Sequence, residues 1–203
     1  MKKILVSQSV YIDSKRKEHG DKLDGSIVTF LRVAGYIPVP VSNFYVNQNM
    51  SNWETESLDL FLKGIDFDGL LLTGGNNIGA HENRDLTEKT LLSWALKNHL
   101  PALGLCRGMQ LMGTLGGGFL QQVSNHVNNY HSISGIICDK VNSYHNLAFK
   151  TLPPEYSILA KSSDGVIEAF KHASNRWEGW MWHPERENEI RLNDVRRTRE
   201  LFR

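Results

Sequence analysis

Short apolar runs alternate along the chain with longer stretches in which hydrophobic residues have helical spacing. The runs are of strand length and predict buried strands at residues 3–7, 36–41, 68–73 and 101–105. The stretches between them predict helices at residues 26–34, 58–63 and 86–98. Strands that alternate with helices favour right-handed crossovers, and so a mainly parallel sheet with helices on both faces.

The pattern changes in the last third of the chain. Between residues 132 and 169 it is strand, turn, strand, which predicts a small antiparallel extension beside the parallel sheet. Residues 136–140 alternate in polarity, so we expect a strand there with Cys138 as a structural residue. Residues 194–202 predict a closing basic helix. Ligands of such sheets bind at the carboxyl ends of the parallel strands, where Gly75 and Cys106 both fall.

Cys106 has the surroundings of a nucleophile. Gly104 and Gly108 lie two residues before and after it, between a predicted strand and a helix-like stretch. Small residues at these positions allow a cramped strand-to-helix turn that lifts the thiol clear of the sheet. The helix N-terminus favours the thiolate, and the backbone amide of Arg107 points to where an oxyanion would develop. The alternative is a small buried core cysteine.

A matching base occurs in the segment His183-Pro184-Glu185. Histidine can take the thiol proton and return it to a leaving amine, while a carboxylate orients the ring. Pro184 biases His183 toward an extended conformation, so we expect His183 and Glu185 to project to the same side. Such a tripeptide by itself is typical of a surface turn, but together with the cysteine turn it indicates a catalytic pair.

Composition excludes several other classes of function. The chain has 203 residues, 40% of them hydrophobic, which suits one domain over residues 1–203. A net charge of +1 argues against nucleic acid or a membrane as partner. The start of the chain lacks the apolar core of a signal peptide, and no stretch approaches ~20 apolar residues, so we expect a cytoplasmic protein.

Cysteine and histidine side chains could also form a disulfide or bind a metal. Two cysteines in an intracellular chain indicate reduced thiols. No histidine among the eight stands in a His-Glu-x-x-His spacing, and there is no Cys-x-x-Cys pair. The sequence therefore predicts no metal and no cofactor.

Taken together, these segments resemble the class I glutamine amidotransferases and their gamma-glutamyl hydrolase relatives. The matching segments are GLCRGMQ at 104–110, WHPE at 182–185, LTGG at 72–75, VNSYH at 141–145 and SDGVIEA at 163–169. The resemblance implies a flavodoxin-like three-layer α/β sandwich with a mainly parallel central sheet. It also implies cysteine-dependent cleavage of a gamma-glutamyl amide.

The same resemblance implies a role for individual residues. Cys106 would be the nucleophile, His183 the general base and acid, and Glu185 its orienting partner. The backbone amides of Gly75 and Arg107 would form the oxyanion hole. The glutamyl group would contact four residues, the last three largely through backbone atoms: Gln110, Ser143, Tyr144 and His145.

The fate of the amine is the open question. A hydrolase releases glutamate and an amine-bearing product, whereas a glutaminase subunit delivers ammonia to a separate synthetase, a partner that is possible but not required. The segments at 142–145 and 163–169 favour the hydrolase branch. A third possibility, a non-catalytic sensor of a gamma-glutamyl metabolite, would not need all three of Cys106, His183 and Glu185.

Two departures from the family pattern concern the substrate. Met181 stands where many amidotransferases have glutamine, and Asn76 and Asn77 stand where hydrolase-like members often have aspartate. The basic residues 15–17 follow the first strand, and Arg16 is a candidate for binding a phosphate-bearing leaving group. The alternative is a solvated charged loop. Length and this loop resemble the branch that hydrolyses a nucleotide-linked phosphoramidate conjugate in bacterial capsule synthesis.

Overall fold

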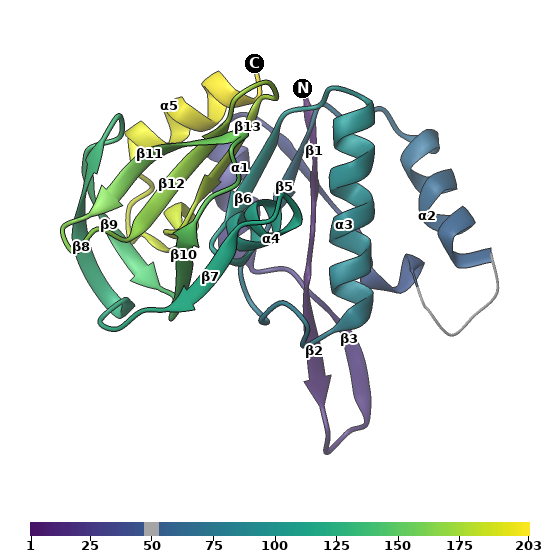
Figure 1. Ribbon diagram of the computed structural model, residues 1–203. Coiled ribbons are helices and arrows are strands. Elements are labelled where there is room, and N and C mark those ends of the chain that lie inside the picture. Colours follow the sequence, from purple (N-terminus) through teal and green to yellow (C-terminus); the bar gives the residue numbers. More distant parts are fainter. Residues whose placement is uncertain (47–52) are drawn as a thin grey trace.

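A nine-stranded mixed sheet runs through the computed structural model, which describes residues 1–46 and 53–203 (Figure 1). One half of this sheet is parallel, with the neighbours in the order β4, β1, β5, β6 and β13. Their bounds are Ile37–Pro40, Lys3–Val6, Gly69–Leu72, Ala102–Leu105 and Trp177–Trp180. This is the strand order of a flavodoxin-like fold, so the predicted fold class is confirmed.

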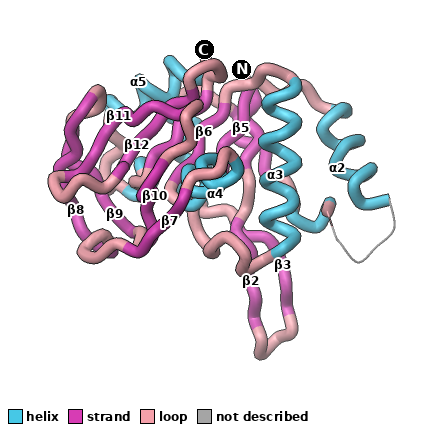
Figure 2. The backbone as a smooth tube through the Cα atoms, viewed as in Figure 1, coloured by secondary structure: helices cyan, strands magenta, loops and turns pink. Residues whose placement is uncertain are grey.

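The other half of the sheet is antiparallel and continues from β13 through β12, β11, β8 and β9. These strands span Ile167–His172, Tyr156–Ser162, Val127–Gly135 and Asp139–Tyr144. A separate pair, β7 (Phe119–Gln122) and β10 (Leu147–Thr151), belongs to the same part of the chain. Figure 2 shows this region as strands without helices. The extension is thus larger than the strand-turn-strand unit predicted from residue 132 onward.

Helices cover both faces of the parallel half. On one face lie α2 (Trp53–Gly64), α3 (Glu82–Lys97) and α4 (Arg107–Leu115), and on the other lie α1 (Gly25–Val33) and α5 (Leu192–Leu201). Two short 3-10 helices, Asn43–Tyr45 and Pro184–Arg186, complete the elements. The helices predicted at 26–34, 58–63, 86–98 and 194–202 are therefore present, although α2 and α3 begin earlier than their hydrophobic patterns indicate.

The central strands are apolar throughout because each strand is buried on both faces. In β5, Leu70 and Leu72 belong to the core under α2, α3 and α4, whereas Leu71 belongs to the core under α1 and α5. All three side chains are fully buried. A strand covered by helices on both sides has no face for polar residues, which explains the continuous run that the sequence shows.

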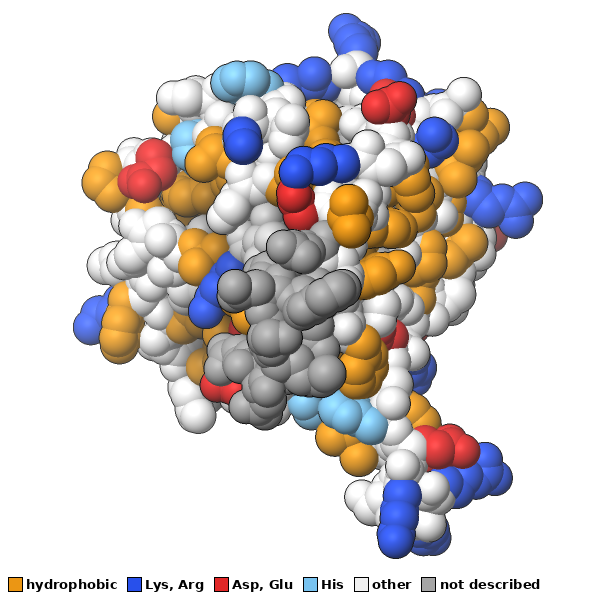
Figure 3. All heavy atoms as spheres, turned by 90° about the vertical axis from the view of Figure 1, so that its right-hand side faces the viewer, with side chains coloured by type: hydrophobic (Ala, Val, Ile, Leu, Met, Phe, Trp, Pro, Cys, Tyr) orange, Lys and Arg blue, Asp and Glu red, His pale blue; other side chains and the backbone are white. Residues whose placement is uncertain are grey.

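The basic segment after β1 forms a hairpin that the sequence did not predict. Strands β2 (Ser9–Asp13) and β3 (Glu18–Lys22) pair antiparallel and project from the body (Figure 1). The Asp13 side chain accepts hydrogen bonds from the backbone amides of Lys15 and Arg16, which closes the turn. Cationic side chains gather at the projecting tip (Figure 3).

The prediction of a strand at residues 136–140 is wrong for its first three residues. Residues 136–138 form the turn between β8 and β9, because β8 ends at Gly135, whose φ of 141° is unfavourable for other residues. Cys138 is exposed rather than structural, and its thiol lies 3.4 Å from the carbonyl oxygen of Gly135. The alternation of residues 136–140 thus belongs to a turn and the first two residues of β9.

No helix in the described ranges 1–46 and 53–203 is both long and apolar enough to cross a membrane.

The central position of β5 gives a test of the core. We expect Leu70→Ala to lower the free energy of unfolding by about 2–5 kcal/mol, because it leaves a cavity between β5 and the covering helices. Leu60→Ala is the matched control, since Leu60 is 70% exposed, and should change stability by less than about 0.5 kcal/mol. Urea unfolding followed by circular dichroism measures both, and equal effects of the two variants would contradict this packing.

Candidate active site

The predicted strand-to-helix turn at Cys106 is present between β6 and α4. Cys106 has φ 49° and ψ −104°, a strained conformation for a residue with a side chain. A Cβ on Gly104 would lie 2.6 Å from the backbone of Gly108, and one on Gly108 would lie 2.3 Å from the carbonyl oxygen of Leu72. The turn therefore needs both glycines, and it places the cysteine at the N-terminus of α4.

His183 and Glu185 form a buried pair directly after β13. The Nδ1 atom of His183 lies 2.7 Å from Oε1 of Glu185, and the two side chains are 2% and 4% exposed. Glu185 lies in the 3-10 helix that Pro184 opens, so the segment after His183 is a tight turn and not the extended chain we expected. The turn still brings both side chains together, because the carboxylate folds back beneath the ring. Nε2 of the imidazole is left for Cys106.

The environment of His183 favours the imidazolium. Burial by itself lowers the pKa of this ring, but hydrogen bonds with Cys106 and Glu185, and the negative charges of both, raise it to about 9. The geometry therefore suits a cationic histidine next to a thiolate, the arrangement of an activated cysteine nucleophile.

Asn142 fixes the backbone of His183. Its side-chain oxygen accepts a hydrogen bond of 2.9 Å from the His183 amide, and its nitrogen donates one of 2.7 Å to the His183 carbonyl. The same nitrogen donates to Glu187 at 2.8 Å. Asn142 is fully buried in β9, within the predicted VNSYH segment, but nothing in that pattern indicates that it binds the backbone of His183.

A cavity of about 130 Å³ opens in front of Cys106. The predicted residues that line it are Gly75, Cys106, Arg107, Gln110, Tyr144, His145 and His183. Glu185 lies behind His183, as an orienting carboxylate must. Seven of the ten predicted site residues thus meet in one place, although they come from four separate segments of the chain.

The side chains predicted to hold substrate differ in how free they are. Gln110 donates 3.0 Å to the carbonyl of Leu147. The Ser143 hydroxyl is buried and donates to the carbonyl of His126, and Nδ1 of His145 lies 3.2 Å from the Leu147 carbonyl. The Tyr144 ring stands edge-on to His183, with 5.8 Å between ring centroids. Ser143 and His145 therefore offer backbone atoms to a ligand and use their side chains inside the protein.

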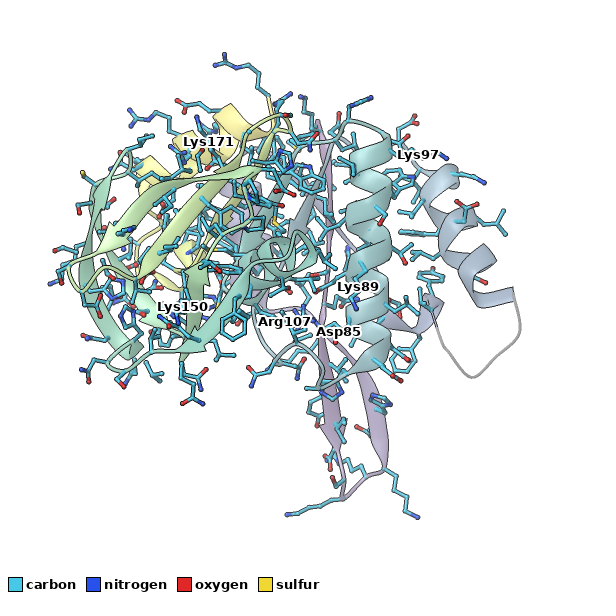
Figure 4. The ribbon with its side chains drawn as sticks, in the orientation of Figure 1. Asp85, Lys89, Lys97, Arg107, Lys150 and Lys171 are labelled. Carbon is cyan, nitrogen blue, oxygen red and sulfur yellow. The ribbon has the colours of Figure 1, made fainter. Side chains whose placement is uncertain are left out.

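Four buried charged side chains connect the nucleophile helix to α3. The Arg107 guanidinium forms ion pairs with Asp85 and Glu88, and Glu88 also accepts a 3.1 Å bond from Nε of Arg84. Figure 4 shows Arg107 and Asp85 close together at the end of α3. Two cations and two anions balance, which is what burial of charge requires. Although its backbone belongs to the cavity wall, the Arg107 side chain points away from it.

The same network holds the loop of Gly75. Nη2 of Arg84 donates 2.9 Å to the carbonyl of Thr73 and 2.8 Å to that of Gly74, and Nη1 donates to the side-chain oxygen of Asn76. Gly75 itself has φ 110°. Sequence reasoning missed Arg84, Asp85 and Glu88. The available signal is that α3 carries charges on the face that its apolar residues mark as buried, with Arg84 and Glu88 one turn apart.

Of the residues that the structure describes, Arg16 lines neither the cavity at Cys106 nor its neighbour. It lies at the tip of the β2–β3 hairpin, whereas the hairpin base contacts the glycine loop, where Asn76 accepts a 2.8 Å bond from the Val10 amide. The neighbouring cavity, of about 210 Å³, is lined by Lys22 and shares His183 and Arg186 with the first. The cations nearest the site are thus Lys22 and Arg186, and phosphate binding by Arg16 stays a prediction.

The prediction of no metal rests on spacing along the chain, which does not reveal donors brought together by folding. Donor atoms of His126, His131 and Glu168 lie within 4.8 Å of one another, in a group separate from Cys106 and His183. These residues come from β12, β8 and the loop before β8.

The raised pKa of His183 gives a pH test. A proton bound more tightly in the folded chain stabilises it fully below about pH 6.5, and this stabilisation is lost as the pH rises toward about 9. We expect the free energy of unfolding to fall between about pH 7 and 9, and to fall less in His183→Gln. Urea unfolding at several pH values measures this. The exposed His19→Gln control should keep the wild-type slope, and an equal slope in His183→Gln would contradict the expectation.

Comparison with known proteins agrees with this geometry. The family model described as glutamine amidotransferase class-I matches residues 40–191. Gamma-glutamyl-CDP-amidate hydrolase of Campylobacter jejuni is 32% identical over 139 residues, which are 66% of this chain and 68% of that protein. A subunit of the glutamine-hydrolysing GMP synthase of Methanococcus vannielii is 28% identical over 167 residues, 74% of this chain and 77% of the relative.

Solved structures show the same fold. A putative GMP synthase subunit from Thermoplasma acidophilum superimposes with a TM-score of 0.71 over all of this chain and 92% of the other, at 20% identity. A glutamine amidotransferase from Thermotoga maritima gives a TM-score of 0.61 at 14% identity, over 99% and 93% of the two chains. The chain therefore belongs to the class I glutamine amidotransferase family.

Proposed function

We propose that this protein hydrolyses a gamma-glutamyl amide bond through a thioester on Cys106. The observation that carries the proposal is the convergence of Cys106, the buried pair of His183 and Glu185, and the loop of Gly75 at one cavity. A thiol at a helix N-terminus, beside a histidine oriented by a carboxylate, is the arrangement for nucleophilic attack on a carbonyl.

In the first half of the reaction, the Cys106 thiolate attacks the gamma-carbonyl carbon of the glutamyl amide. The carbonyl oxygen becomes an oxyanion, which the backbone amides of Gly75 and Arg107 stabilise. The carbon–nitrogen bond then breaks, the His183 imidazolium gives its proton to the departing nitrogen, and a glutamyl thioester with Cys106 remains.

In the second half, water attacks the thioester carbon and gives a proton to His183, which is now neutral. The carbon–sulfur bond breaks, glutamate leaves, and Cys106 and His183 return to the thiolate and imidazolium. Gln110 and Tyr144 contact the glutamyl group from the cavity wall, and Ser143 and His145 contribute backbone atoms, since their side chains are engaged inside the protein.

The leaving group that we propose is a nucleotide phosphoramidate. The supporting relative from Campylobacter jejuni is named for hydrolysis of gamma-glutamyl-CDP-amidate, and this reaction here would release glutamate and cytidine diphosphoramidate for capsule synthesis. Two cations near His183 suit a diphosphate: Lys22, and Arg186, whose guanidinium lies 5.0 Å from the centre of the Tyr144 ring.

A second candidate is a glutaminase subunit that delivers ammonia to a synthetase. Relatives named as one subunit of a glutamine-hydrolysing GMP synthase favour it, because that name implies a second subunit. The two candidates share the thioester chemistry and differ in the group that leaves. They are therefore separated by the substrate and not by the triad.

Glutamate release by the purified chain separates them. The assay compares glutamine with a panel of gamma-glutamyl conjugates, including gamma-glutamyl-CDP-amidate. We expect fast release from one conjugate and little from glutamine. Release from glutamine alone, or only after a synthetase subunit is added, would support the second candidate, and no release under any condition would contradict both.

Cys106→Ala should lower turnover at least about a thousandfold, because no thioester can form. Glu185→Gln should cost less, because it disturbs the orientation and charge of His183 and leaves the nucleophile in place. Steady-state glutamate release measures both, with circular dichroism to check that each variant is folded. Substantial activity in Cys106→Ala would end the covalent scheme.

The cation that binds the leaving group can be identified by a pair of variants. If Arg16 binds phosphate, Arg16→Ala raises the Michaelis constant for a nucleotide conjugate and leaves that for a small gamma-glutamyl amide unchanged. Arg186→Ala tests the cation at the cavity in the same way. An unchanged constant for the nucleotide conjugate in Arg16→Ala would remove that residue from the site.

A further inference from the structure

Three histidine rings surround the carboxylate of Glu168 in the antiparallel half of the fold. The ring nitrogens Nδ1 of His126, Nε2 of His131 and Nε2 of His145 lie 3.2, 3.3 and 3.5 Å from the same oxygen, Oε1. Side-chain exposure is 0% for Glu168 and 1–12% for the three histidines. We call these four residues the histidine cluster.

Outer partners fix the hydrogen positions on two of the rings. Nε2 of His126 lies 3.0 Å from the carboxylate of Asp164, and Nδ1 of His145 lies 3.2 Å from the carbonyl of Leu147. Both partners accept hydrogen bonds, so these nitrogens carry hydrogen. In the neutral rings, the nitrogens that face Glu168 then carry lone pairs. Metal-binding histidines are oriented in this way, by a carboxylate or carbonyl on the other nitrogen.

The inner atoms of the histidine cluster have no hydrogen bonds. Within the described part of the chain, the three inward nitrogens and both oxygens of Glu168 are buried polar atoms without a partner. Unpaired polar atoms are costly in a protein interior, and here lone pairs face a carboxylate, which adds repulsion. A cation at the centre would satisfy all of them at once.

The distances fit a transition metal. Zinc binds histidine nitrogen and carboxylate oxygen at about 2.1 Å, so two ligands of a tetrahedral site lie about 3.4 Å apart. The three nitrogen-to-oxygen distances in the cluster are 3.2–3.5 Å. We propose that His126, His131, His145 and Glu168 form a binding site for a divalent transition metal of the zinc type.

The ligand set also indicates the class and the role of the metal. Imidazole nitrogens select zinc and its neighbours over magnesium and calcium, which prefer oxygen. Four protein ligands in a buried place leave no open position, which is typical of a structural site. The metal would join four segments, namely β8, β12 and the loops that hold His126 and His145. Tyr144, next to His145, would thereby be held at the wall of the cavity at Cys106.

The competing explanation is a cluster of imidazolium rings around one carboxylate. It requires hydrogen bonds from the rings to Glu168, whereas the inward atoms have no partner of suitable geometry. It also places cationic rings with centroids 4.7 and 4.8 Å apart beside His126, with one buried carboxylate between them. This explanation predicts a folded protein that binds no metal.

The test measures metal binding and does not depend on activity. The untagged chain with Cys106→Ser and Cys138→Ser, which removes competing thiols, is stripped with EDTA and titrated with zinc chloride. Bound zinc is measured by mass spectrometry after gel filtration, and thermal unfolding is followed with zinc and with magnesium. We expect about one zinc per chain and a rise in Tm with zinc alone.

Variants locate the metal. His131→Gln removes a ligand and should weaken zinc binding at least about a hundredfold, while the exposed His19→Gln should not change it. Asp164→Asn alters only an outer partner that is 55% exposed, so it should fold and bind about 10–100-fold more weakly. A folded parent chain without stoichiometric zinc, or zinc binding that both His131→Gln and Asp164→Asn leave unchanged, would overturn the proposal.

Discussion

The site depends on the buried ion network of Arg84, Asp85, Glu88 and Arg107. Backbone amides stabilise an oxyanion only if they are held in place before the reaction, and this network holds both of the candidates. Arg107 follows the nucleophile, and its side chain is bound by two carboxylates of α3. Arg84 grips the carbonyls before Gly75. Loss of one charge leaves its partner buried and uncompensated, which typically costs about 3–5 kcal/mol.

A second constraint comes from the antiparallel half of the fold. Asn142 lies in β9, at the edge of the sheet, yet it binds both backbone groups of His183, which follows the central strand β13. The parallel half supplies the nucleophile and the glycine loop, and the antiparallel half sets the backbone position of the base. The cavity therefore depends on the relative placement of the two halves.

The sequence predicted the fold class and the triad segments because their signals are local. The glycines around Cys106 lie within two residues of it, and Glu185 lies two residues from His183. The ion network, Asn142 and the histidine cluster join residues from separate elements, and no spacing along one chain reveals such partners. The β2–β3 hairpin was missed because residues 15–21 are polar on both faces, so they lack the alternation by which strands are recognised.

The position of β13 has a consequence for synthesis of the chain. This strand, Trp177–Trp180, lies between β6 and β12 and is the only one that joins the parallel and antiparallel halves of the nine-stranded sheet, among the residues described. Before it leaves the ribosome, β6 and β12 have no partner on their inner sides. The nascent protein therefore holds two incomplete sheets with open edges, and it acquires a reactive cysteine's full surroundings only in the final step of assembly.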